Sequence, residues 1–179
     1  MHTSLYFAYG SNLLSTRLTA RCPSARVVGV AMTTGWTVSF TKPGGDGSGK
    51  AGLIQRQGAV QPGVVYELAA DDMPVLDRIE GVGHGYTRHD DFQVTMAGDG
   101  NLISTATYMP QRHDHALIPF DWYLALCIAG ATENSFDPQV LRAFQATPFQ
   151  PDDEDHRPAR LAGIEALQAA GHDDWQAIL

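Results

Sequence analysis

Cysteines and basic residues are both scarce in this sequence. Only two cysteines occur among 179 residues, and neither Cys22 nor Cys127 has a CxxC neighbour. This excludes a disulfide framework and a cysteine-based metal or redox motif, so we expect both thiols to be reduced and buried. Lysines and arginines number 12 against 20 aspartates and glutamates, which gives a formal net charge of −8. We expect no nucleic-acid partner, because such binding requires a basic face that displaces counterions.

Long apolar runs are also missing. No window approaches the 18 or so apolar residues of a membrane span, so we expect no membrane partner. The first residues, MHTSLYFAYGSN, lack the basic start and long apolar stretch of a secretory signal, and we expect a cytoplasmic protein. Hydrophobic residues make up 44% and charged residues 18% of the chain, which is a globular balance.

The chain changes character after its first two-thirds. Short β-branched or aromatic runs predict strands at residues 4–9, 26–32, 36–40, 52–56, 63–68, 86–96 and 103–109. Helices are predicted at residues 13–20, 72–79 and 122–129, from Asp137-Pro138 onward, and at about 158–170 before Gly171. The pattern predicts an α+β fold, a mostly antiparallel curved sheet or small barrel surrounded by helices. We expect residues 1–150 to form one domain and residues 151–179 a C-terminal helical extension packed on it.

Three motifs that often carry chemistry lack the context that they need. GGDGSGK at 44–50 begins like a phosphate loop, but Ala51 replaces the metal-binding Ser or Thr and a strand pattern follows. We expect a flexible hairpin loop there. His113 and His115 have no third ligand at a readable spacing, which favours surface-loop histidines over a zinc site. The acidic run at 152–155 is expected to solvate a linker. The sequence therefore predicts neither a metal nor a cofactor.

The segment DDMPVLDRIEG at 71–81 favours a catalytic carboxylate. Proline in the first turn and glycine at the end bound a short helix. Apolar residues recur every three positions along it and predict a buried stripe: Met73, Leu76 and Ile79. Glu80 leans toward this stripe at the C-terminal end of the helix, and both surroundings raise the pKa of a carboxyl group. The residues alone leave an equal alternative, in which Glu80 turns to water or pairs with Arg78 or Arg88.

A second segment, YFAYGSNLL at 6–14, runs from a predicted strand into a predicted helix without a polar turn before Gly10. The turn Gly10-Ser11-Asn12 offers clustered backbone N–H groups, which suit a carboxylate or a developing oxyanion. The alternative is an ordinary strand-ending turn. Tyr6, Tyr9 and Tyr123 could wall a cavity beside it, although each tyrosine taken singly is more often a core residue.

These segments resemble a known family. YFAYGSNLL at 6–14, CPSA at 22–25, GVVYEL at 63–68, LDRIEGV at 76–82 and YLALCIAGATEN at 123–134 are similar, in this order, to the γ-glutamylcyclotransferases. The family also includes γ-glutamylamine cyclotransferases and AIG2-like proteins. The resemblance covers roughly residues 5–148 and leaves the last thirty or so residues outside it.

The resemblance implies an enzyme that closes the γ-glutamyl part of its substrate into 5-oxoproline and releases an amino acid or amine. It implies Glu80 as the catalytic acid/base and Tyr123 as a binding tyrosine. The implied substrate-binding loop comprises Tyr6, Phe7, Ala8, Tyr9, Gly10 and Ser11. Two alternatives stay open: a γ-glutamylamine-type enzyme with another acceptor, and a non-catalytic binder of the same fold. The sequence also leaves both a monomer and a homodimer open.

Overall fold

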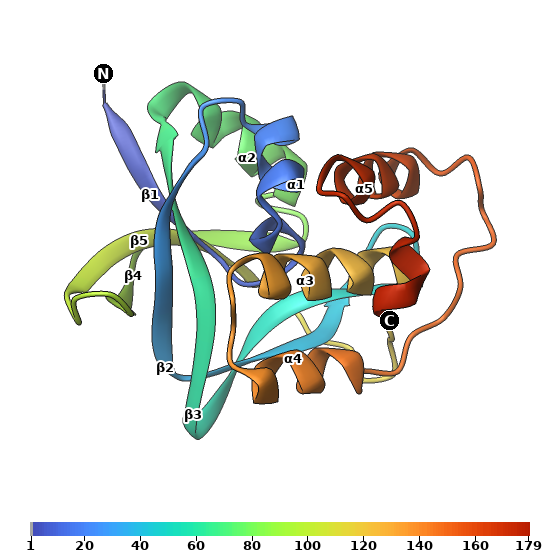
Figure 1. Ribbon diagram of the computed structural model, residues 1–179. Coiled ribbons are helices and arrows are strands. Elements are labelled where there is room, and N and C mark those ends of the chain that lie inside the picture. The colour runs from blue at the N-terminus through green and yellow to red at the C-terminus, as the bar shows by residue number, and fades with distance from the viewer. Residues whose placement is uncertain (1) are drawn as a thin grey trace.

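The computed structural model describes residues 2–179 as a strand barrel with helices packed along one side (Figure 1). In the part of the chain described, five strands close into a barrel in the order β1-β3-β2-β4-β5. Their bounds are β1 (Thr3–Ala8), β2 (Arg26–Pro43), β3 (Gly49–Ala69), β4 (Tyr86–Met96) and β5 (Leu102–Pro110). Neighbouring strands run antiparallel except β1 and β5, which pair in parallel at Tyr6 and Ala106. The predicted α+β class and mostly antiparallel barrel are confirmed.

The prediction of four short strands at residues 26–32, 36–40, 52–56 and 63–68 is wrong, because the chain forms two long strands there, β2 and β3. Each is one continuous, bent strand, because β2 passes through Gly35 and β3 passes through Gly58 without ending. Both glycines have a positive φ, +83° and +75°, and they lie where the β2–β3 register shifts. A bulge of this kind bends a strand and increases its twist while the pairing resumes beyond it. Here the glycines mark bends, which the sequence reading took for strand ends.

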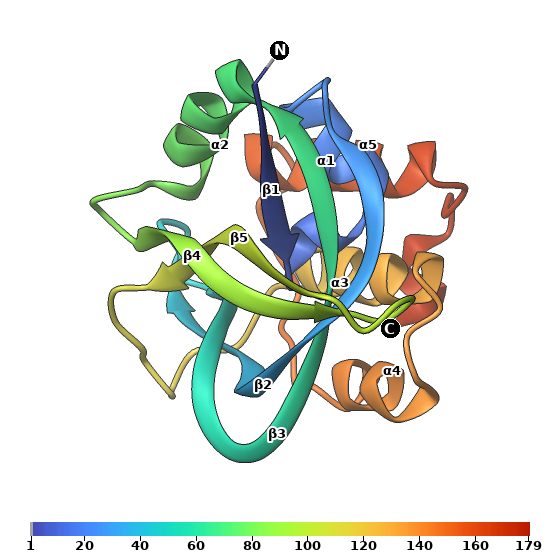
Figure 2. The ribbon, with the colours of Figure 1, turned by 90° about the vertical axis from the view of Figure 1, so that its left-hand side faces the viewer.

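The helices cover one side of the barrel and one of its ends. Figure 2 shows the strands in front and most of the helices behind them. The bounds are α1 (Ser15–Arg21), α2 (Met73–Glu80), α3 (Asp121–Glu133), α4 (Pro138–Gln145) and α5 (Pro158–Ala169). Helix α3 packs against α4, α5 and the start of the chain, and all its residues through Ala131 are buried. None of the helices described is long and apolar enough to cross a membrane.

Several local predictions are confirmed. Asp137 caps α4 by accepting a hydrogen bond from the backbone N–H of Gln139, and Gly171 follows α5 with a φ of +88°. Cys22 and Cys127 are free and buried. The loop at 44–48 joins β2 to β3 as a hairpin. His113 and His115 are exposed in a loop.

Two side chains lie where the sequence did not place them. Ile79 is 43% exposed, so the buried stripe of α2 consists of Met73 and Leu76 alone. Asp152 does not solvate a linker, since it is buried and accepts hydrogen bonds from the Trp122 indole Nε1 at 2.9 Å and the Arg157 Nε at 2.8 Å. This pair fastens the start of the C-terminal extension to α3.

Helix α5 packs closely on α1 and α3. The hydroxyl of Thr16 donates to the carbonyl of Ala166 at 2.7 Å. Gly163 lies so near the Trp122 ring that a Cβ there would fall 2.7 Å from it. The extension therefore packs on the helices beside the barrel, and its first residues reach the site described next.

Candidate active site

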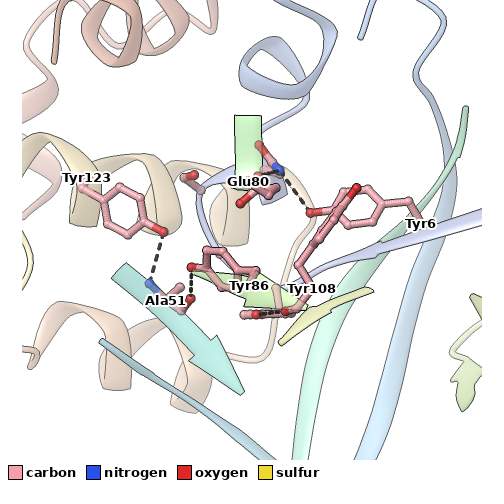
Figure 3. A pocket seen from close by; sticks show the side chains of 10 residues that line it. Tyr6, Ala51, Glu80, Tyr86, Tyr108 and Tyr123 are labelled. Carbon is pink, nitrogen blue, oxygen red and sulfur yellow. Dashed lines mark hydrogen bonds between the residues drawn. The ribbon is translucent and has the colours of Figure 1, made fainter. Parts of the chain in front are cut away.

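A polar cavity lies where the barrel meets α2 and α3 (Figure 3). Its solvent-accessible volume is about 20 Å³, within about 290 Å³ of space that includes its open mouth, and we call it the inner chamber. Four strands or strand ends, both helices and the turn after β1 contribute its walls. The lining residues are Tyr6, Tyr9, Gly10, Ser11, Asn12, Ala51, Glu80, Tyr86, Tyr108 and Tyr123.

Glu80 is the one carboxylate in this wall, and its side chain is 16% exposed. Its Oε1 accepts a hydrogen bond from Asn12 Nδ2 at 3.0 Å and lies 3.2 Å from Arg21 Nη1. Arg21 Nη1 also donates to Asn12 Oδ1 at 2.9 Å, so the three side chains form a closed triangle. No hydrogen bond from residues 2–179 reaches Oε2, which leaves one carboxylate oxygen for a ligand.

Glu80 pairs with Arg21, a partner that the sequence did not suggest. The side chain neither turns to water nor pairs with Arg78 or Arg88, because it pairs with Arg21. Arg88 pairs instead with Asp77 at 2.5 Å. Glu80 is the last residue of α2, and the helix ends at Gly81, whose φ of +69° is the left-handed conformation of a helix C-cap. This ending points the carboxylate side chain across the gap toward the end of α1.

Two tyrosine hydroxyls are fixed by the backbone of one residue. Tyr86 Oη donates to the Ala51 carbonyl at 2.6 Å, and Tyr123 Oη accepts from the Ala51 N–H at 3.1 Å. Both rings are buried, and burial raises the pKa of each hydroxyl, so both stay protonated at neutral pH. Tyr123 Oη thus accepts from the backbone and keeps its own proton for another partner.

The other tyrosines complete the wall on the barrel side. Tyr6 Oη accepts from Asn12 Nδ2 at 3.0 Å, and Tyr9 Oη donates to the carbonyl of Tyr108. Tyr108 Oη donates to Asp77 Oδ1 at 2.8 Å. Burial first, and then the negative charge of Glu80, raise the pKa of Tyr6 well above its ordinary value. The rings therefore form a wall of protonated hydroxyls around one carboxylate.

The predicted site residues divide into two groups. The structure brings seven of them together around the inner chamber: Tyr6, Tyr9, Gly10, Ser11, Asn12, Glu80 and Tyr123. Phe7 and Ala8 are fully buried and are not part of the chamber wall. Phe7 packs against Phe92 on the opposite face of β1, because neighbouring side chains of a strand point to opposite sides.

Sequence reasoning missed four contributors, Arg21, Ala51, Tyr86 and Tyr108. Tyr86 had a weak signal, since it starts a predicted strand directly after the glycine-rich loop that follows Glu80. Ala51 acts through its backbone, which leaves no side-chain signature. Arg21 and Tyr108 come close to the site only through the packing of α1 and the closure of the barrel.

The turn after β1 differs in form from the predicted helix entry. A single 3₁₀ turn (η1, Ser11–Leu13) follows Gly10, and extended Leu14 separates this turn from α1. Gly10 has a φ of −121°, so it needs no left-handed conformation. Its constraint is space, because a Cβ there would lie 2.7 Å from the Cβ of Ala51.

A wider cavity of about 480 Å³ opens from the inner chamber toward solvent, and we call it the outer chamber. The two chambers share four wall residues: Ser11, Glu80, Tyr86 and Tyr123. The other walls come from α1, the β2–β3 hairpin, α2, α3 and residues 157–159 of the extension. Five basic side chains and two acidic ones line it, in a protein whose net charge is −8. The outer chamber is thus a locally positive entrance.

The residues that the structure describes provide no ligand set for a metal ion. Within residues 2–179, no group of three or more His, Cys, Asp or Glu side chains is placed to hold a metal ion. His113 and His115 stack on each other with ring centroids 6.4 Å apart, and His113 Nδ1 lies 2.8 Å from the hydroxyl of Thr41. Both histidines lie outside the walls of the two chambers.

Comparisons with known proteins identify a family. The family model "Gamma-glutamyl cyclotransferase, AIG2-like" matches residues 6–125, which include every wall residue of the inner chamber. The chain is 32% identical to the gamma-glutamylcyclotransferase of Bos taurus over 136 residues, covering 73% of this chain and 71% of the relative. It is 30% identical to the gamma-glutamylcyclotransferase of Homo sapiens over 154 residues, covering 83% and 80%.

The fold agrees as well. A solved structure of a gamma-glutamyl cyclotransferase superposes with a TM-score of 0.79 at 25% identity, covering 93% of this chain and 99% of that one. The match extends beyond the residues of the family model and includes much of the C-terminal extension. Sequence motifs, fold and relatives all confirm the resemblance, and the chain belongs to the gamma-glutamyl cyclotransferase, AIG2-like family.

Proposed function

We propose that this protein is a γ-glutamylcyclotransferase, which converts a γ-glutamyl amino acid or peptide into 5-oxoproline and a free amino acid or peptide. The observation that carries the proposal is the placement of Glu80. Its carboxylate faces a chamber lined by tyrosines and has one oxygen uncommitted, in a chain of this family. The polar wall of the chamber suits the charged and polar groups of a glutamyl moiety.

Glu80 acts as the general acid/base in this proposal. The α-amine of the substrate attacks its own γ-carbonyl carbon, and a new C–N bond forms as Glu80 takes a proton from the amine. The tetrahedral intermediate then breaks its older C–N bond while Glu80 returns the proton to the departing nitrogen. Oε2 of Glu80, which has no hydrogen bond from the described residues, is the atom placed to accept the first proton.

The chamber supplies the geometry that cyclisation needs. Both reacting atoms belong to one molecule, and holding them in an aligned, folded conformation is worth roughly 7–11 kcal/mol of barrier. The tyrosine wall fits such a folded glutamyl group. The hydroxyls of Tyr6 and Tyr123, which accept hydrogen bonds and keep their own protons, and the N–H groups of the turn at 10–12 suit the substrate carboxylate and the oxygen that becomes negative in the intermediate. This reaction uses no metal and no cofactor, because the nucleophile is part of the substrate and the base is a side chain.

A substrate panel tests the proposal. The wild-type protein is incubated with γ-glutamyl dipeptides, glutathione and γ-glutamylamines, and both 5-oxoproline and the released amine are quantified. We expect 5-oxoproline from γ-glutamyl amino acids or peptides. Product from the γ-glutamylamines alone would replace this function by the amine-specific one. Binding of 5-oxoproline without turnover of any substrate would make the protein a non-catalytic binder.

A further inference from the structure

Arg17 is the unexplained charge of the outer chamber. It lies inside α1, lines the outer chamber and is only 6% exposed. None of residues 2–179 forms a hydrogen bond or an ion pair with its guanidinium, and its Nε is completely buried without a partner. Burying an unpaired charge is costly, and buried charges in proteins are normally paired or hydrogen-bonded.

Three other cations of this wall, all partly buried, have carboxylate partners. Arg21 pairs with Glu80, Lys50 pairs with Asp46 at 2.7 Å, and Arg157 pairs with Asp152 at 2.8 Å. Lys42 has no carboxylate partner among the described residues, but it is partly exposed, unlike Arg17, and its ammonium lies 4.7 Å from the centre of the Tyr86 ring. Arg17 therefore differs from its neighbours in lacking an anion while being almost fully removed from water.

The electrostatic surroundings of Arg17 are those of a ligand site. Burial, followed by repulsion from Arg21, lowers the pKa of its guanidinium, while the negative charge of Glu80 opposes that shift. Arg17 is thus close enough to Glu80 to sense its charge and yet makes no contact with it. An anion that enters the outer chamber beside Glu80 would supply the missing partner.

The positions of the two chambers on either side of Glu80 indicate which part of the substrate carries this anion. The inner chamber encloses the glutamyl group in our proposed function, and Glu80 lies at the boundary between the chambers. The bond that breaks lies beside Glu80, so the leaving group extends into the outer chamber. The leaving nitrogen of an amino acid is one carbon away from its carboxylate, which brings a negative charge to this entrance.

We propose that the outer chamber is a leaving-group subsite in which Arg17 binds the carboxylate of the departing amino acid or peptide, a role that rests on the function proposed above. The substrate class is then a γ-glutamyl compound whose leaving part carries a free carboxylate. γ-Glutamylamines, which lack that carboxylate, are poor substrates. A planar guanidinium suits this task because it binds a carboxylate through two parallel hydrogen bonds.

Two substrates that differ only in the leaving carboxylate test the subsite. They are γ-glutamylalanine and γ-glutamylalaninamide, and kcat/KM is measured for both from 5-oxoproline release. We expect wild type to favour the acid by about tenfold to a hundredfold, the range for a hydrogen-bonded charge. Arg17→Met should remove this preference by raising KM for the acid while kcat/KM for the amide stays within about twofold. Arg17→Lys should keep part of the preference.

Two controls separate a ligand role from a structural one. Arg56→Met removes an exposed arginine of β3, far from both chambers, and should leave the acid/amide ratio unchanged. The melting temperature of Arg17→Met should equal or exceed that of wild type, because the substitution removes an unpaired buried charge. A large drop in melting temperature together with equal losses for both substrates would make Arg17 a structural residue and overturn the proposal.

The test also distinguishes failure of the subsite from failure of the proposed function. If wild type turns over acid and amide equally well, the subsite is wrong while the cyclotransferase function stands. If neither substrate yields 5-oxoproline, the proposed function fails. Binding of the two compounds to Glu80→Gln by calorimetry then decides the role of Arg17 without turnover. Tighter binding of the acid supports the carboxylate site, and equal or absent binding overturns it.

Discussion

Arg21, the last residue of α1, and Glu80, the last residue of α2, form an ion pair across the mouth of the inner chamber, with 3.2 Å between Nη1 and Oε1. Two helix C-termini, each carrying partial negative charge, therefore meet at a carboxylate. Arg21 offsets this accumulation of negative charge. Because it also holds Asn12, it links the orientation of Glu80 to the turn after β1.

Arg21→Met should lower kcat by about tenfold or more, since it removes a hydrogen-bonded charge from the proposed base. KM should change less, because Arg21 makes its contacts with Glu80 and Asn12. Steady-state kinetics of 5-oxoproline release measure both parameters. Arg21→Lys should recover part of kcat. Arg78→Met, which removes an exposed arginine two residues before Glu80, is the matched control and should behave as wild type.

Glu80→Gln should lower turnover by at least about a hundredfold, the ordinary cost of losing a general acid/base. The amide keeps the size of the side chain, so the variant should fold and bind 5-oxoproline. Circular dichroism and calorimetry check these two properties. Glu165→Gln, on the exposed face of α5, removes one carboxylate without touching the chambers. A Glu80→Gln protein with wild-type turnover would remove Glu80 from the mechanism.

Gly10→Ala should reduce stability and turnover together. The added Cβ would overlap Ala51, whose backbone holds the hydroxyls of Tyr86 and Tyr123. Overpacking of this kind costs about 1–3 kcal/mol. Thermal melts and kcat per folded molecule give the two effects separately.

The double variant Gly10→Ala/Ala51→Gly moves the methyl group to the other side of the same contact. We expect it to recover most of the stability and activity lost by Gly10→Ala, because the total volume is restored. Failure of this rescue, with stability still low, would show that something other than the Ala51 contact requires glycine at this position.

Asp152→Asn should destabilise the protein in a pH-dependent way. Hydrogen bonds from Arg157 and Trp122 outweigh burial and hold the pKa of Asp152 below its ordinary value. The carboxylate therefore contributes stability that is complete above the unfolded-state pKa of about 4 and is lost as the pH falls through the lower folded value. The difference in melting temperature between wild type and variant should be largest near neutrality and shrink in acid. Asp153→Asn, at the exposed neighbour, should show no such profile.

Chelators should leave activity unchanged, because the proposed reaction draws its nucleophile from the substrate and its base from Glu80. Turnover is measured before and after dialysis against EDTA, and again after addition of magnesium or zinc. A zinc-dependent hydrolase treated alongside verifies the chelation. Loss of activity that returns with an added metal ion would contradict the metal-free mechanism.

Most of the fold follows from local patterns. Strand β4 and the ends of α2 and α5 were predicted to within a residue or two, because Pro, Gly and alternating side chains mark them locally. The long hairpin of β2 and β3 escaped prediction for a physical reason. Gly35 and Gly58 interrupt the alternation of apolar residues, yet the strand pairing resumes beyond each of them. Pairing between distant strands, which a local window does not contain, decides that outcome.

The site was predictable only in part. Glu80 and the turn at 10–12 lie in short motifs and were found, whereas Arg21 and Tyr108 join the site through tertiary packing. Ile79 shows the limit of periodicity, since α2 is too short to bury three residues of its stripe and the third lies at the chamber mouth. The hydrogen bond between Trp122 and Asp152 was not predicted, because an acidic run is usually solvated. Only the fold of the extension places Trp122 beside this aspartate.

Closure of the barrel between β1 and β5 has a consequence for synthesis of the protein. The inner chamber combines Tyr6, near the start of the chain, with Tyr108 and Tyr123, and the outer chamber adds Arg157. A nascent chain on the ribosome therefore possesses no complete chamber until β5 and α3 have emerged to meet a strand made about a hundred residues earlier. The wall around Glu80 therefore forms late, because no fragment that stops before β5 and α3 contains both the carboxylate and the tyrosines that surround it.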